Sequence, residues 1–260
     1  MPTIPLLPLP AGTIARALRA VALATAVGLA ACTPFGPQRA GIATDWRPSP
    51  NFDARSVSLV VIHYTAVDTA ATALRTLTSP SSRVSAHYLV ERGGNIVQLV
   101  DERARAWHAG DSRWGPIDDV NSASIGVELD NDGREPYPPA QIAALVRLLA
   151  DLRDRHGLGA ASFVGHADVA PARKSDPGPL FPWRTLGVQG FGLWCEPPWP
   201  PAPPGFDALL GLSAIGYDLR QPEAAVRAFR TRFTPEAIDD APVERDRDLI
   251  ACLAQASIAR

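Results

Sequence analysis

The chain has 260 residues and carries 25 Lys and Arg against 27 Asp and Glu, a formal net charge of −2. A balance this close to neutral excludes the clustered basic face that nucleic acid binding requires, so no nucleic acid partner is expected. Hydrophobic residues make up 46% of the chain, which excludes disorder for most of it, and three cysteines are too few for a disulfide-dense scaffold.

Residues 1–31 have the pattern of an export signal. Arg16 and Arg19 precede an uncharged apolar run of twelve residues, 20–31. Twelve helical residues rise about 18 Å, less than the roughly 30 Å hydrocarbon core, so the run is interpreted as the core of a signal peptide. It ends in Leu29-Ala-Ala-Cys32, which resembles the bacterial lipobox. That resemblance implies cleavage before Cys32 and lipidation of its sulfur; ordinary secretory cleavage is the alternative.

A lipoprotein with Thr33 after the lipidated cysteine is expected at the outer membrane, facing the periplasm, with residues 32–45 as its tether. Export places the protein in an oxidising compartment, where two cysteines can pair. Cys195 and Cys252 could therefore form a disulfide or remain two buried thiols, and the sequence leaves both open.

Short apolar runs alternate with helical patterns over residues 46–186. Strands are expected at 57–62, 86–90, 96–100, 125–129 and 162–165, with a hairpin turn at 91–95. Helices are expected over 69–78, with Asp68 as N-cap, and from Pro139 to His156, where Gly157 follows. This order predicts an α/β (α+β layered) domain, in which a mixed central β-sheet is flanked by helices.

The remainder of the chain differs in composition. Six prolines within residues 196–205 predict that 187–205 is an extended linker. Residues 206–260 have helical patterns at 222–233 and 242–256, which predict a small all-α domain. A domain of this size buries little surface by itself, so it is expected to pack on its neighbour.

Two histidines and a carboxylate suggest a metal site. His63 and His166 each follow an apolar strand, and the ends of adjacent parallel strands meet at one edge of a sheet. Asp176 lies ten residues after His166, in a loop that the following Pro-Gly-Pro makes rigid. Two imidazoles and one carboxylate could form a three-ligand zinc site with a fourth position open for water; two core histidines and a turn-capping aspartate are the alternative.

Glu128 is the one charged residue in the strand Ile125–Leu129. A carboxylate is rarely placed in an apolar strand without a partner or a function, although alternation also allows it to face solvent. Facing a metal-bound water, it would serve as a general base.

Six segments, in order over about residues 55–186, resemble the type 2 N-acetylmuramoyl-L-alanine amidase family, whose zinc fold is shared with peptidoglycan recognition proteins. They are Val61–Thr65 (VIHYT), Val84–Val90 (VSAHYLV), Ala106–Gly110 (AWHAG) with Trp114, Asn121–Leu129 (NSASIGVEL), Gly165-His166, and Arg173–Gly178 (RKSDPG). The lipobox and the helical C-terminus are similar to the outer-membrane lipoprotein amidases, whose C-terminal module binds peptidoglycan.

The resemblance implies one zinc ion per chain, held by His63, His166 and Asp176. Glu128 would be the base and Lys174 would stabilise the oxyanion. The implied reaction is hydrolysis of the amide between the lactyl group of muramic acid and L-Ala, in peptidoglycan or muropeptides. The resemblance suggests that His108 contacts the muropeptide. Trp107 and Arg173 are also predicted to bind substrate: Trp107 could stack on a sugar ring or serve only in packing, and Arg173 could meet a peptide carboxylate or pair with an acid structurally.

The other two histidines have simpler interpretations. His87 is expected in the core, and His156 on the surface at a helix end. A monomer is expected. Two alternatives to the amidase remain: a peptidoglycan-recognition lipoprotein without activity, and an Fe(II) oxygenase with the same donor types.

Overall fold

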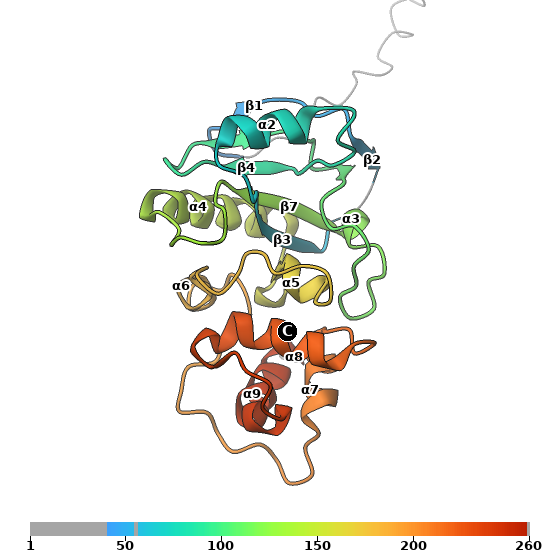
Figure 1. Cartoon of the computed structure of the whole chain (residues 1–260), viewed down its shortest axis with the longest axis vertical. Coiled ribbons are helices and arrows are strands. Elements are labelled where there is room, and N and C mark those ends of the chain that lie inside the picture. The colour runs from blue at the N-terminus through green and yellow to red at the C-terminus, as the bar shows by residue number, and fades with distance from the viewer. Residues whose placement is uncertain (1–40, 55–56, 259–260) are drawn as a thin grey trace, which may run out of the picture. The chain divides into compact units, whose positions relative to one another are not determined.

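The structure, a computed structural model, describes residues 41–54 and 57–258 (Figure 1). The predicted signal peptide, Cys32 and most of the predicted tether lie outside these residues. Within the described ranges, no helix combines the length and the apolar character that crossing a bilayer requires.

A six-stranded sheet forms the centre of the protein (Figure 1). In spatial order its strands are β1 (Asp45–Trp46), β5 (Ile96–Gln98), β4 (Tyr88–Val90), β7 (Ser124–Leu129), β3 (Leu59–Tyr64) and β8 (Phe163–Gly165). Only β4 and β5 pair antiparallel, as the hairpin turn predicts, and the other neighbours are parallel. The mixed sheet flanked by helices is confirmed. A separate two-stranded sheet joins β2 (Phe52–Ala54) and β6 (Ala104–Ala106).

The long helix α4 (Pro139–His156) covers one face of the sheet. Its Leu145, Leu148 and Leu149 are fully buried in one cluster with Val60 and Ile62 of β3. Gly157 ends the helix in the left-handed conformation at φ 64°, as predicted for a glycine at this position. Side chains alternate between the two faces along a strand. Because Val60 and Ile62 point toward α4, Leu59, Val61 and His63 point to the other face of the sheet.

Two further clusters cover the opposite face. Helix α2 (Ala70–Thr78) packs Ala73 and Leu77 against Leu89 and Val97 of the sheet. The predicted N-cap of α2 is wrong: Thr69, rather than Asp68, accepts the hydrogen bond from the Thr72 N–H. The hydroxyl is one position nearer the first turn, where it reaches the free amide. The short helices α3 (Val120–Ala123), α5 (His166–Val169) and α6 (Trp183–Gly187) complete this part.

The C-terminal helices pack on the same face as His63. They are α7 (Ala208–Ile215), α8 (Pro222–Phe233) and α9 (Arg247–Ile258), with 3₁₀ turns at Pro235–Ala237 and Val243–Asp246; another 3₁₀ turn, Ala160–Ser162, precedes β8. Phe229 and Ile250 belong to one buried cluster with Leu59 and Val61 of β3. The described residues therefore form a single compact unit, and the predicted boundaries at 186 and 205 fall inside it.

Cys195 and Cys252 are joined by a disulfide across a sequence separation of 57 residues. The bond links the start of the proline-rich segment to helix α9, which resolves the alternative that the sequence left open.

We expect the double variant Cys195→Ser/Cys252→Ser to lose about 4 kcal/mol of unfolding free energy, because closing a loop of this length restricts the unfolded chain. Urea unfolding of the variant and of the oxidised wild type measures the difference. The wild type kept under a reducing agent is the control and should match the variant. Equal stabilities in all three would show that the disulfide contributes nothing.

A buried carboxylate lies under the C-terminal end of α4. Glu102 is fully buried and accepts hydrogen bonds from Tyr88, from Arg155 and from His156 at 2.7 Å. The prediction that His156 is a surface residue is wrong: it does end the helix, but its ring turns inward to the carboxylate of Glu102, which is fully buried. Burial alone would raise the pKa of Glu102, yet these hydrogen bonds lower it to about 2.

We expect Glu102→Gln to cost about 3 kcal/mol of unfolding free energy at pH 7. Because the folded-state pKa is depressed, the contribution of Glu102 is complete above pH 5 and disappears as the pH falls toward 2. Chemical denaturation between pH 7 and pH 3 should therefore show the two proteins converging at low pH. Glu244→Gln, at an exposed position, is the control. A difference that does not change with pH would contradict the assignment.

Candidate metal and catalytic site

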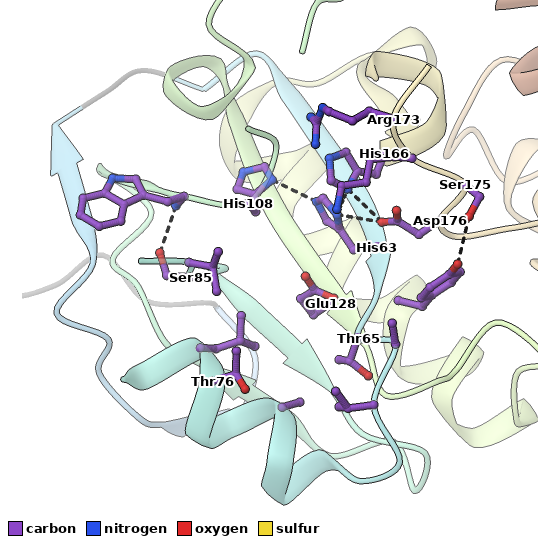
Figure 2. A pocket seen from close by; sticks show the side chains of 18 residues that line it. His63, Thr65, Thr76, Ser85, His108, Glu128, His166, Arg173, Ser175 and Asp176 are labelled. Atoms are coloured by element: carbon purple, nitrogen blue, oxygen red, sulfur yellow. Dashed lines mark hydrogen bonds and ion pairs between the residues drawn. The ribbon is translucent and has the colours of Figure 1, made fainter. Parts of the chain in front are cut away.

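Strand register places His63 and Glu128 side by side. The two residues are directly paired partners in the parallel ladder of β3 and β7, so both side chains project from the same face of the sheet. Figure 2 shows both at the same hollow, with the Glu128 carboxyl below the His63 ring. They line a pocket of about 390 Å³ together with His166, Lys174 and Asp176.

Three donor atoms converge at the end of these strands. His63 Nδ1 lies 2.9 Å from His166 Nδ1, and each of these nitrogens lies 3.0 Å from Asp176 Oδ2. His166 is the first residue of α5, directly after β8, and the Ala167 N–H bonds the Asp176 carbonyl at 2.8 Å. All three side chains are buried, with exposed fractions of 1%, 3% and 7%. The structure thus brings the three predicted ligands together as one possible metal site.

Hydrogen bonds on the outer side of His63 fix which ring nitrogen carries its proton. The Ser124 hydroxyl donates to the Val120 carbonyl at 2.5 Å, so its oxygen must accept from His108 Nε2 at 3.2 Å. His108 Nδ1 is then an acceptor and takes the proton of His63 Nε2 at 3.0 Å. The proton positions follow from this hydrogen-bond network. They leave His63 Nδ1 unprotonated, with a lone pair.

The tautomer of His166 follows from a single hydrogen bond. Its Nε2 lies 3.0 Å from the carbonyl of Ala109, which can only accept, so this nitrogen carries the proton. The Nδ1 lone pair then faces His63 Nδ1 and the Asp176 oxygen. Both outer partners of the histidines belong to neighbouring residues, His108 and Ala109, in the loop Trp107–Gly110.

The three atoms fit a divalent metal such as zinc. Burial, together with the neighbouring His166, lowers the pKa of His63 to about 4, which keeps it neutral at physiological pH. Two imidazole lone pairs and a carboxylate repel one another at this distance unless positive charge lies between them. Zinc prefers this donor set, and tetrahedral ligands would lie about 3.3 Å apart, close to the spacing observed.

Glu128 is a half-buried acid in the pocket wall, with one carboxyl oxygen, Oε2, buried and unpaired among the described atoms. Burial raises the pKa of Glu128 well above its ordinary value; Asp176 adds to the shift, and Lys174 opposes it. A cation at the ligand atoms would favour its ionised form. A carboxyl group with an unused oxygen facing the pocket has the properties of a proton acceptor.

Lys174 lies in an exposed loop that is held by several hydrogen bonds to the rest of the protein. Its backbone N–H bonds the Ala170 carbonyl at 3.0 Å, and the neighbouring Ser175 hydroxyl pairs with Tyr64 at 3.1 Å (Figure 2). Tyr137 donates to the Pro177 carbonyl at 2.7 Å. These bonds hold Lys174 at the rim of the pocket, within electrostatic reach of Glu128.

The predicted substrate-binding residues all line the pocket, and each of the three also has a structural partner. His108 bonds the ligand His63, as described above. Arg173 donates to the carbonyls of Ala109 and Asp111, so it holds the Trp107–Gly110 loop. The Trp107 backbone N–H bonds the Ser85 hydroxyl at 3.0 Å. Their roles in substrate binding stay predictions.

The sequence reasoning missed Asn121 and Ser124. The Asn121 side chain accepts from the N–H groups of His108 and Ala109, at 3.0 and 2.8 Å, and so shapes the loop between the two histidine ligands. Both residues lie in the segment Asn121–Leu129, which the family resemblance included without assigning them a role.

Gly126 makes room for this arrangement. A Cβ atom here would lie 2.5 Å from the His108 ring, so any side chain would displace that ring. Behind it, His87 is fully buried and bonded to the Gly126 N–H and the Ala104 carbonyl, which confirms the prediction of a core histidine.

Two histidines and an aspartate around one point, with a half-buried glutamate beside them in a pocket, are the arrangement typical of metal-dependent hydrolases. A family model, N-acetylmuramoyl-L-alanine amidase, matches residues 53–179. The chain is 37% identical to N-acetylmuramoyl-L-alanine amidase AmiD of Escherichia coli over 230 residues, which span 76% of this chain and 82% of the relative. This chain belongs to the N-acetylmuramoyl-L-alanine amidase family.

The chain is also similar to other amidases and to solved structures of amidases. The chain is 35% identical to 1,6-anhydro-N-acetylmuramyl-L-alanine amidase AmpD of Haemophilus influenzae, covering 55% of this chain and 91% of the relative. The structure of E. coli AmiD with the substrate anhydro-N-acetylmuramic acid-L-Ala-D-gamma-Glu-L-Lys matches with a TM-score of 0.66 and 35% identity, over 85% of this chain and 92% of AmiD. AmpDh3 of Pseudomonas aeruginosa, in complex with anhydromuramic pentapeptide, matches with a TM-score of 0.68 and 33% identity, over 78% and 93%.

Proposed function

We propose that this protein is a zinc-dependent amidase that hydrolyses the bond between the lactyl group of N-acetylmuramic acid and L-Ala. The convergence of three lone pairs from His63, His166 and Asp176 beside the unpaired carboxyl of Glu128 carries this proposal. One zinc ion per chain would complete the site, and we propose that the protein acts as a monomer.

Each residue of the site would have its own role in the hydrolysis of the amide. When bound, zinc would lower the pKa of a coordinated water to about 7 and polarise the substrate carbonyl. Glu128 would take the proton of the attacking water and later deliver it to the leaving amine of L-Ala. Lys174 would place its ammonium group near the carbonyl oxygen as negative charge develops there. His108 and Ala109 hold the two ligand imidazoles in the required tautomer.

We propose anhydro-muramyl peptides as substrates, because AmiD and AmpDh3, which share this fold, form complexes with anhydro-muramic acid peptides. The pocket volume of about 390 Å³ suits the junction of one sugar and the first peptide residues. The role would be in cell-wall turnover and recycling. Activity on the ordinary muramyl form is decided by the assay below.

The alternative of a recognition protein without activity is less well supported. A protein that only binds muropeptides has no need of a carboxyl group with a buried, unpaired oxygen next to three metal ligands, because burying such an oxygen costs stability. The oxygenase alternative has no support in the fold, since the mixed sheet with helices on its faces belongs to the amidase family.

A soluble form that begins at Thr33 tests the proposal. With zinc it should release stem peptides from anhydro-muramyl and muramyl tripeptides, and mass spectrometry of the products measures both rates. A chelator should reduce release to background, and added Zn²⁺ should restore it. Stable muropeptide binding without release, in a zinc-loaded sample, would favour the recognition protein.

We also propose that Cys32 is lipidated and that the protein is anchored in the outer membrane facing the periplasm, on the strength of Leu29-Ala-Ala-Cys32 and Thr33. The C-terminal residues 206–260 would bind peptidoglycan. Labelled palmitate should enter the full chain but not Cys32→Ala in an expressing bacterium. Sedimentation of the soluble form with intact sacculi tests the C-terminal part, and a supernatant that keeps all the protein would argue against it.

A further inference from the structure

A buried ion pair connects the C-terminal helices to the helix that begins at His166. Arg232 of α8 pairs with Asp168 of α5, and the Tyr217 hydroxyl donates to the same carboxylate at 2.6 Å. The exposed fractions of Asp168, Arg232 and Tyr217 are 2%, 5% and 2%. The contact is therefore closed to solvent, and nothing in the proposed reaction uses it.

The carboxylate of Asp168 also fixes the turn that carries the metal ligand. Its Oδ2 accepts the Gly165 N–H at 2.7 Å, directly before His166. The other end of the Arg232 guanidinium donates to the Phe163 carbonyl at 3.1 Å and lies 3.9 Å above the Trp183 ring. Strand β8 and helix α5, which meet at His166, are thus both bonded to one arginine from the C-terminal helices.

A second set of contacts joins the C-terminal part to the segment 113–115, on the other side of the metal site. The Gly115 N–H bonds the Gly216 carbonyl at 2.7 Å, and the Trp114 ring packs edge-on against Tyr217 with centroids 5.1 Å apart. The Arg113 N–H bonds Val169 at the end of α5 at 2.8 Å. This segment continues the loop 107–110, whose residues accept hydrogen bonds from both histidine ligands.

From these contacts we propose that Arg232 and Tyr217 are positioning residues for the metal site, acting through Asp168 on His166. The inference rests on the proposed function and gives the C-terminal helices a second task besides binding peptidoglycan. Residues that orient a metal ligand from outside contribute about 10- to 100-fold to metal affinity or activity. A purely structural ion pair would change stability but leave the metal affinity of the folded protein unchanged.

Arg230 offers a matched control on the same helix. It is equally buried, at 1% exposed, and pairs with Asp246 at 2.8 Å inside the C-terminal part. It therefore has the same residue type and a similar burial, but its bonds go to residues 239–246 and not to α5. Arg230→Gln and Arg232→Gln should both lower the melting temperature.

The experiment compares these variants in the soluble form of the whole chain. The Zn²⁺ affinity of the metal-free protein is measured by competition with a chromophoric chelator, at a temperature where each variant is folded. We expect Arg232→Gln to weaken Zn²⁺ binding about tenfold or more and to lower kcat with KM nearly unchanged, whereas Arg230→Gln binds Zn²⁺ like the wild type. Equal Zn²⁺ affinities in all three proteins, or equal losses in both variants, would overturn the inference.

Tyr217→Phe keeps the ring packed on Trp114 and removes only the hydroxyl, so it provides an answer if Arg232→Gln does not fold. It should also weaken Zn²⁺ binding, by a few-fold, and an affinity equal to the wild type would count against the inference. A wild type that binds Zn²⁺ but releases no peptide would refute the proposed function alone. A wild type that binds no Zn²⁺ would refute both.

Discussion

Glu128→Gln is expected to lower kcat/KM for a muropeptide about a thousandfold or more while the protein keeps its zinc. The amide has the shape of the carboxyl group but cannot take a proton from the attacking water, and general bases contribute about 10²–10⁴-fold. Because Glu128 Oε2 has no partner in the described structure, the replacement breaks no hydrogen bond to that atom. The melting temperature should therefore not fall.

Steady-state kinetics together with zinc analysis of the purified protein check this expectation. Glu236→Gln, an exposed glutamate on the C-terminal part, is the control and should retain full activity. Undiminished turnover by Glu128→Gln would refute the assigned base, even if the metal site were confirmed.

His63→Ala is expected to abolish both zinc binding and activity. The loss of one of three protein donors should weaken Zn²⁺ binding by more than the roughly 10- to 100-fold that outer partners contribute. It also leaves His108 Nδ1 without the proton it accepts at 3.0 Å. The metal content after dialysis, measured by mass spectrometry, should fall from one zinc per chain to a small fraction.

His156→Ala is the matched control for this second expectation. It removes a histidine whose partner, Glu102, belongs to the cluster under α4, so it should lower stability without changing the zinc content. Retention of one zinc per chain by His63→Ala would mean that the metal binds elsewhere.

Several parts of this fold follow from local sequence. Most of the β-branched run at 57–62 lies in the central strand β3, which extends two residues further to Tyr64, and the apolar spacing from Pro139 to His156 becomes the helix that covers the sheet. The glycine at 157 ends that helix because it accepts a positive φ. These features depend on residues close together in the chain, so their physical cause is visible in the sequence.

The type of site can also be inferred from the sequence. Histidines at two strand ends, an aspartate in a proline-flanked loop and an isolated charge in an apolar strand indicate a metal and a base before any coordinates are considered. Sequence could not give the separation of the three ligand atoms, since it depends on how β3, β8 and the loop after α5 pack. It also could not decide between a disulfide and two thiols at Cys195 and Cys252, because the distance between them is set by folding.

The sequence by itself predicted the layered fold from residue type and short-range periodicity, and its resemblance to a known family implied the ligand set and the candidate base. Only the tertiary structure decided the proton positions on His63 and His166, the inward turn of His156, and the ion pair between Arg232 and Asp168. All of these are contacts between residues more than forty positions apart in the chain. A hydrogen bond or a buried charge pair depends on the final distance and solvent exposure of its atoms, and these exist only once the chain has folded.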